Sequence, residues 1–208
     1  NFLLFFAFYL TMPLLPLYLK DAFDANKDTI GVVLSGFVVA ALLVRPFSGF
    51  IVDNFPRKKV LMLCYFMFVI FFGGYIVAGT LLMFFIVRTA HGLALGSATV
   101  ANSTIAIDVL HPERRAEGIG FYGLSNNLAM ALGPSVALWA YHIYPDFKFL
   151  FVLSLISAGI GFIVISTIKN RQPVIARRNE PLSLDRFFLL KGWRAGLSIA
   201  CFAFAYGI

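Results

Sequence analysis

The chain has 208 residues, of which 60% are hydrophobic and only 13% are charged, and its formal net charge is +7. A soluble domain has about 25% charged residues, so this sequence lacks the polar side chains needed to cover a water-exposed surface. The composition argues against a soluble enzyme, a disulfide-rich secreted domain and a disordered chain, and it predicts an all-α membrane protein.

Apolar runs between helix-breaking residues predict six membrane-spanning helices and the start of a seventh. We expect the spans near residues 2–19, 31–52, 60–78, 81–107, 118–141 and 148–168, with the seventh beginning near residue 193. Because short loops join the first six spans, neighbouring helices should be antiparallel and form one bundle.

The order of these spans predicts the domain organisation. Residues 1–168 should form a six-helix transmembrane domain, residues 169–192 a cytoplasmic linker, and residues 193–208 the start of helix 7. The chain opens and closes inside apolar runs. We therefore expect a fragment of a longer protein, namely the first half of a transporter built from two six-helix halves.

Lysines and arginines are divided unevenly among the predicted loops. The loops after spans 2, 4 and 6 hold twelve of the 17 basic residues, whereas the other three loops hold only three. Because basic residues accumulate in cytoplasmic loops, we expect a cytoplasmic N-terminus in a multi-pass protein of the cell membrane, the inner membrane in a bacterium. The basic excess is thus a topology signal, and we expect no nucleic-acid partner.

A charged loop joins spans 2 and 3. It reads GFIVDNFPRKKV from Gly49, with Asp53, Arg57 and Lys58 at ordered spacings. Gly49 would allow a close backbone approach, and Asp53 at a membrane boundary needs a partner such as Arg57, one turn later. The loop resembles the signature of the major facilitator superfamily, Gly-x-x-x-Asp-x-x-Gly-Arg-Lys/Arg-Lys/Arg, except that Pro56 replaces the second glycine. The alternative is that any short cytoplasmic loop is basic.

The fourth span contains the segment RTAHGLALG, which begins at Arg88. It is similar to the fourth-helix pattern of the same superfamily, Arg-x-x-x-Gly followed by small residues. An arginine inside a span costs about 2.5–3.5 kcal/mol, so Arg88 should face the bundle interior or a wet cavity. Gly92 and Gly96 should let a neighbouring helix pack closely. Arg88 acts either in transport or as a link between helices, and His91 is either functional or merely hydrogen-bonded.

The fifth span matches in part a pattern found mainly in the exporters of this superfamily, which is Gly, eight residues, Gly, three residues, Gly-Pro, two residues, Gly. The corresponding residues here are Gly120, Ala129, Gly133, Pro134 and Ala137. Pro134 should bend the helix, and the small face should pack tightly against another helix, which we expect in the rest of the protein. Ordinary small-residue packing, with no bearing on transport direction, is the alternative.

The resemblance implies alternating access, in which two halves rock around a central site. It also implies that Asp53 and Arg57 belong to a cytoplasmic charge cluster that holds the outward-open state. Asp108, at the inner end of span 4, matches the acidic partner in this cluster, although a solvated helix-end carboxylate is the alternative. The candidate groups of the substrate cavity are Tyr9, Arg88, Asn102, Tyr122, Asn126 and Asn127.

The leading functional hypothesis is a proton-coupled exporter of small amphipathic compounds, and the alternative is a symporter that takes up a sugar, an amino acid or another nutrient. We expect no enzyme activity, because no catalytic, metal-binding or phosphate-binding pattern occurs. No cofactor is expected, and the coupling ion should be the proton, although no carboxylate lies mid-span to carry it. The expected partners are the lipid bilayer, a small-molecule substrate and the second half of the same chain, in a monomer.

Overall fold

The computed structural model describes residues 1–167 and Leu197. The described helices belong to one compact unit, Asn1–Ile175, and a second unit, Ala176–Ile208, contains only Leu197 among the described residues. The predicted linker and, apart from Leu197, the predicted start of helix 7 therefore lie outside the described residues.

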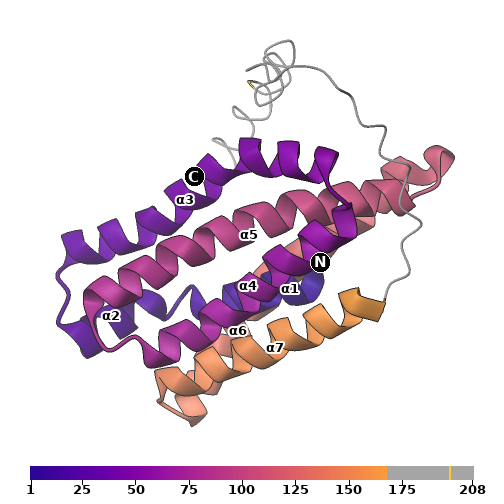
Figure 1. The fold of residues 1–208 in the computed structure, drawn as a ribbon. Coiled ribbons are helices and arrows are strands. Elements are labelled where there is room, and N and C mark those ends of the chain that lie inside the picture. The colour runs from indigo at the N-terminus through magenta and orange to yellow at the C-terminus, as the bar shows by residue number, and fades with distance from the viewer. Residues whose placement is uncertain (168–196, 198–208) are drawn as a thin grey trace. The chain divides into compact units, whose positions relative to one another are not determined.

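The described part of the first unit is entirely helical apart from its connecting turns, with no strand (Figure 1). The elements are α1 (Phe2–Thr11), α2 (Leu15–Phe23), α3 (Lys27–Asn54), α4 (Arg57–Val77), α5 (Leu81–Val109), the 3-10 helix η1 (Pro112–Arg114), α6 (Arg115–Ile143) and α7 (Phe147–Thr167). The last five predicted spans correspond to α3 through α7, and each predicted end lies within four residues of the observed one. The all-α fold class is confirmed.

The first predicted span is broken in two. α1 ends at Thr11, α2 begins at Leu15, and the two helices are bent by 42°. Pro13 and Pro16 account for the break, because a proline has no N–H to donate to the carbonyl four residues earlier and its ring clashes with that carbonyl. The prediction of one continuous helix over residues 2–19 was wrong, and the two prolines were the signal.

Four helices, α3, α4, α5 and α7, are long and apolar enough to cross a membrane, and the bent pair of α1 and α2 makes a fifth if it is one span. α6 has 29 residues, as many as α5. It is less apolar than the other four, because the amides of Asn126 and Asn127 lie among several glycines and serines. Its packing against α1 places it in the same bundle.

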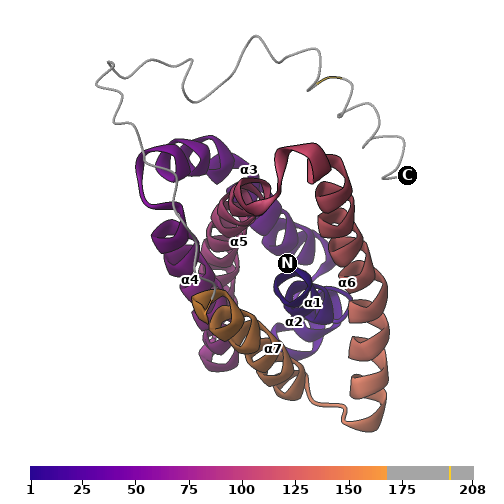
Figure 2. The same cartoon turned by 90° about the vertical axis from the view of Figure 1, so that its right-hand side faces the viewer.

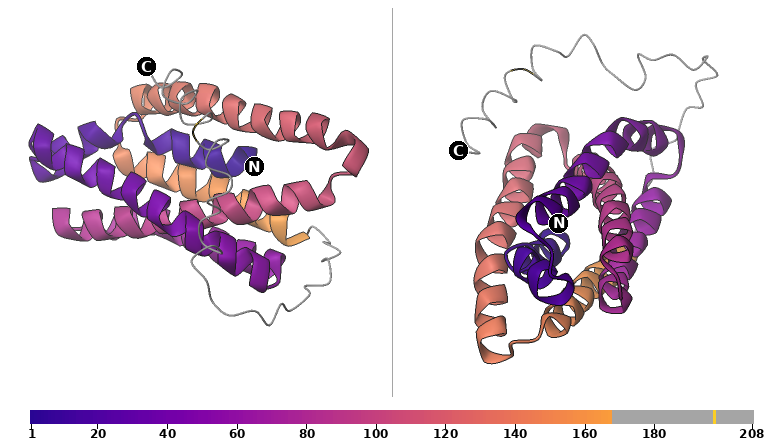
Figure 3. Two further views of the ribbon diagram at one scale, coloured as in Figure 1. Left: turned by 90° about the horizontal axis from the view of Figure 1, so that it is seen from above. Right: turned by 90° about the vertical axis from the view of Figure 1, so that its left-hand side faces the viewer.

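The first three spans and the last three spans of the bundle make equivalent helix contacts. α5 packs against α3 and α4, whereas α1 packs against α6 and α7, and α4 and α7 contact each other. In Figure 2, α1 and α2 lie between α6 and α7, and Figure 3 shows the same bundle from above and from its other side. The first span thus contacts the fifth and sixth as the fourth contacts the second and third. Such equivalence is the mark of a three-helix structural repeat.

Close packing between α3 and α5 depends on two glycines. A Cβ on Gly92 would overlap the Phe37 carbonyl, and a Cβ on Gly96 would lie 2.6 Å from the Ala41 oxygen. The predicted close approach of a neighbouring helix at this Gly-x-x-x-Gly pattern is confirmed. Large aromatic side chains fill the remaining interior, among them Tyr65, Phe68, Phe72, Tyr75 and Phe84.

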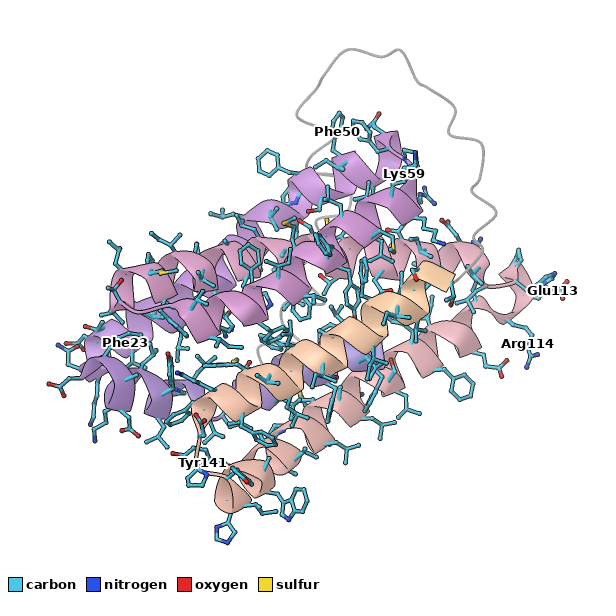
Figure 4. The ribbon with its side chains drawn as sticks, turned by 60° about the horizontal axis from the view of Figure 1, so that its bottom comes forward. Phe23, Phe50, Lys59, Glu113, Arg114 and Tyr141 are labelled. Carbon is cyan, nitrogen blue, oxygen red and sulfur yellow. The ribbon has the colours of Figure 1, made fainter. Side chains whose placement is uncertain are left out.

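The basic loops lie together. Figure 4 shows Lys59, Glu113 and Arg114 at one end of the helices, and Phe23 and Tyr141 at the other. The connections between α3 and α4 and between α5 and α6 therefore meet at one end, as antiparallel neighbours require. This end carries the charge cluster described next.

Candidate functional site

The turn between α3 and α4 has ordinary backbone geometry despite its proline. Phe55 is extended, with φ −120° and ψ 159°, as expected for a residue before proline. Pro56 has φ −55° and immediately precedes Arg57, the first residue of α4. A proline fits this position because its ring fixes φ near that value. The departure from the family's glycine therefore leaves the turn unstrained.

Arg57 brings two carboxylates together at this end of the bundle. Its Nη1 donates a hydrogen bond to Oδ2 of Asp108 at the end of α5, and its Nη2 lies 3.7 Å from Oδ1 of Asp53. The Arg57 and Asp108 side chains are 23% and 21% exposed, whereas Asp53 is 72% exposed. A direct charge-assisted hydrogen bond is stronger than a longer, exposed ion pair. Asp108 is thus the principal partner of Arg57.

Two other residues of the signature loop lie apart from this cluster. The Lys58 Nζ donates to the Ser166 carbonyl at 2.9 Å, which links α4 to α7. Gly49 is half-buried, but a Cβ there would meet no described atom within 4 Å. The close backbone approach predicted at Gly49 is therefore not present among the described residues.

Arg88 lies inside the bundle, with 1% of its surface exposed. Its Nη1 donates to the Tyr75 hydroxyl at 3.1 Å, its Nη2 lies 3.7 Å from the Met12 sulfur, and its Cζ lies 4.0 Å from the centroid of the Phe37 ring. It makes no ion pair with any described carboxylate. The predicted inward orientation is confirmed, and Arg88 connects α3, α4 and α5 with the break between α1 and α2.

His91 extends this contact. Its Nδ1 lies 2.6 Å from the Tyr75 hydroxyl. That oxygen also accepts a hydrogen bond from Arg88, so Tyr75 links the arginine and the histidine. The rings of Phe68 and Phe72 lie 4.6 and 4.7 Å from the imidazole. The arrangement agrees with the interpretation of His91 as a hydrogen-bonded core residue.

The small face of α6 packs against α1. Ala129, Gly133 and Ala137 are buried, and a Cβ on Gly133 would lie 2.5 Å from the Cβ of Tyr9. The expectation that this face packs against a helix in the rest of the protein was wrong, because α1 of the same bundle covers it. At the other end of the pattern, a Cβ on Gly120 would meet no described atom within 4 Å.

We expect Gly133→Ala to lower the melting temperature of the purified full-length protein. The added methyl would press on the α1 backbone, and overpacking of this kind costs about 1–3 kcal/mol. Gly159→Ala on α7 is the matched control, because a Cβ there meets no described atom within 4 Å and alanine favours the helix. Equal melting temperatures for the two variants would contradict the close contact between α6 and α1.

An open hollow of about 370 Å³ lies between helices α1, α3, α5 and α6. Its lining includes Phe5, Arg45, Thr99, Ser103, Tyr122 and Asn126. It thus combines aromatic surface with one cation, hydroxyls and an amide. Pockets that bind small molecules have this composition, a largely apolar lining with a few polar groups that orient the ligand.

The structure brings together only some of the predicted cavity residues. Tyr122 and Asn126 line the hollow, and Asn102 donates to the Tyr122 hydroxyl at 3.2 Å. Tyr9 instead packs against α6, and Asn127 is exposed outside the lining. Arg88 is likewise not part of the lining.

Arg45 is a member of this site that was not predicted. Arg45 lines the hollow from α3. The available signal was a charged side chain within a predicted span, which by itself indicates a functional site. Asn126, which was predicted, lines the same hollow, and its buried Oδ1 has no hydrogen-bond partner among the described residues.

This apolar helical bundle, with several helices long enough to span a bilayer, defines a multi-pass membrane protein. The profile of the Major Facilitator Superfamily matches residues 1–208, and the chain belongs to this family.

Curated relatives are distant in sequence. The quinolone resistance protein NorA of Staphylococcus aureus (strain MRSA252) is 22% identical over all of this chain and 53% of its own length. The uncharacterized MFS-type transporter YqjV of Bacillus subtilis (strain 168) is 24% identical over 62% of this chain and 32% of its own length. The chain spans about half the length of the curated relatives it matches.

Solved structures share the fold. The peptide transporter POT, an E310Q mutant in complex with alafosfalin, has a TM-score of 0.72 at 17% identity, over 98% of this chain and 44% of its own. The human organic anion transporter MFSD10 (TETRAN) has a TM-score of 0.66 at 20% identity, over 79% of this chain and 44% of its own.

Proposed function

We propose that this chain is part of a proton-coupled exporter of small amphipathic compounds that works by alternating access. The observation that carries the proposal is the hollow between α1, α3, α5 and α6, where Phe5 and Tyr122 offer aromatic surface beside Arg45 and Asn126. An amphipathic compound presents the complementary combination of an apolar body and a polar group. The likeness to a quinolone resistance protein supports export of such compounds.

The proposed transporter acts without a cofactor or enzymatic step and uses the proton as its coupling ion. Of the described carboxylates on the helices that line the hollow, Asp53, Asp108 and Glu117 lie at the end that carries the basic loops, and Asp28 lies at the opposite end. We therefore assign proton transfer to a group in the rest of the protein, with the two parts acting together as a monomer in the bilayer. Nutrient uptake by symport is the competing function.

The proposed orientation places the N-terminus and the charged turn in the cytoplasm of the cell. Lys59 and Arg114, at one end of the helices, support it (Figure 4), because cytoplasmic loops are enriched in basic residues. The hollow would then deliver compounds from the cytoplasm toward the outside.

The test uses the full-length protein in inverted membrane vesicles with a fluorescent quinolone. Acidifying the lumen should drive the compound into the vesicles, because inward movement there corresponds to export from the cell, and a protonophore should abolish the movement. A cysteine at the exposed Glu113 should react with an impermeant maleimide in inverted but not in right-side-out vesicles, which checks orientation. Proton-driven accumulation in right-side-out vesicles would instead identify an uptake symporter.

A further inference from the structure

Arg45 is a cation deep within a membrane-spanning helix. It lies nine residues before Asn54, the last residue of the 28-residue α3. At 1.5 Å per residue this is about 14 Å along the helix from that end, within a helix long enough to cross a hydrocarbon core about 30 Å thick. A cation at this depth is costly unless it faces water or an anionic group. Its position therefore requires such a partner.

The described part of the protein supplies no partner for Arg45. Its side chain is exposed in the hollow and makes no hydrogen bond, ion pair or ring contact with a described residue. Arg57 and Arg88 differ from it, because Arg57 donates a hydrogen bond to Asp108 and Arg88 donates one to Tyr75. Within residues 1–167 the Arg45 guanidinium thus has no acceptor, and its donors are available to the contents of the hollow or to water.

One neighbouring polar group, the Tyr122 hydroxyl, adds a hydrogen-bond donor. The Tyr122 hydroxyl accepts a hydrogen bond from Asn102, so its own proton is available to a ligand. The hydroxyls of Thr99 and Ser103 donate to carbonyls of their own helix, at 2.8 and 3.0 Å, and so only accept. No described lining residue is acidic. The hollow therefore offers a positive charge and a hydroxyl donor, without a described negative charge to bind a cation.

We propose that Arg45, with Tyr122, forms a subsite for an anionic oxygen group, and that the substrate is a carboxylate-bearing compound with an apolar body. A guanidinium holds the two oxygens of a carboxylate at once, and Phe5 and Val100 provide apolar surface in the same hollow. This inference rests on the proposed function in one respect, the use of the hollow as the substrate site.

Equilibrium binding of two matched probes tests the subsite. Dansylglycine carries a carboxylate, and dansylglycinamide has the same fluorophore with a neutral amide. The full-length protein in phosphatidylcholine nanodiscs should bind dansylglycine at least about tenfold more tightly than dansylglycinamide. A difference of this size is the effect of one hydrogen bond to a charged group. Arg45→Gln should reduce this preference to less than about twofold.

Two further variants make the result specific. Arg115→Gln removes an exposed cation at the start of α6 and should keep the full carboxylate preference. Arg45→Lys retains the charge but cannot bind both carboxylate oxygens in one plane, so its preference should fall between those of the wild type and the glutamine variant. If Arg45→Gln does not assemble in the membrane, the carboxylate preference of Arg45→Lys alone tests the subsite.

Three results would overturn the proposal. The first is equal binding of the two probes by the wild type, which is expected if an acid in the rest of the chain pairs with Arg45. The other two are an unchanged carboxylate preference in Arg45→Gln and an unchanged carboxylate preference in Arg45→Lys. Because binding is measured without a gradient, its outcome is separate from that of the export experiment. A carboxylate preference without proton-driven export would refute the proposed function and leave the subsite standing.

Discussion

Arg88→Ala should abolish transport and lower the stability of the protein by about 2–5 kcal/mol, the usual range for truncating a large buried side chain. The side chain is 1% exposed, contacts Phe37 and Met12, and donates to Tyr75. Its removal leaves a cavity where several helices and the break in the first span meet. Melting of the purified protein and export in inverted vesicles measure the two effects.

Arg88→Lys separates charge from shape. Lysine keeps the positive charge but loses the planar group that lies over the Phe37 ring while it donates to Tyr75, so we expect little transport and intermediate stability. Arg115→Ala, at an exposed position, is the control and should resemble the wild type. Full transport by the alanine variant would remove Arg88 from the mechanism, and full transport by the lysine variant would show that a point charge suffices.

The sequence alone predicted the helices well because hydropathy and turns act locally. Asn26 and Thr80 accept hydrogen bonds from backbone amides in the first turns of α3 and α5, which are standard start signals for helices. The break after Thr11 was missed because the run is apolar throughout, and a hydropathy pattern does not register the backbone bond that Pro13 removes.

The site was only partly predictable, because contacts between residues near each other in the sequence can be predicted and contacts between distant helices cannot. Asp53 and Arg57 are only four residues apart, at the end of α3 and the start of α4, so their proximity follows from their nearness in the chain. Asp108 was expected only from the family resemblance. The covering of Gly133 by α1 depends on how distant helices pack, which periodicity does not determine. Arg45 was overlooked because it stands outside any motif, although its charge within a span was visible.

Asp108→Asn should reduce transport about tenfold, and more than Asp53→Asn does. Asp108 accepts a charge-assisted hydrogen bond from Arg57 with both side chains mostly buried, and such a bond contributes about 1.5–3 kcal/mol. Asp53 is 72% exposed and 3.7 Å from Arg57, an arrangement worth about 0.2–1 kcal/mol. The Arg57–Asp108 contact holds the turn between α3 and α4 against the end of α5, whereas the Arg57–Asp53 pair lies within the turn itself. Losing the stronger one shifts the balance of access states further.

The export assay in inverted vesicles, normalised to the amount of protein in the membrane, checks this order. Glu117→Gln is the matched control, because the Arg114–Glu117 pair is at the same end of the bundle but has side chains 73% and 50% exposed. It should change transport less than about twofold. Exchanging the charges, with Arg57→Asp and Asp108→Arg together, should recover part of the activity that Asp108→Arg alone loses. A larger loss in Asp53→Asn than in Asp108→Asn would mean that the cluster works through Asp53, in an arrangement of the turn different from the one seen here.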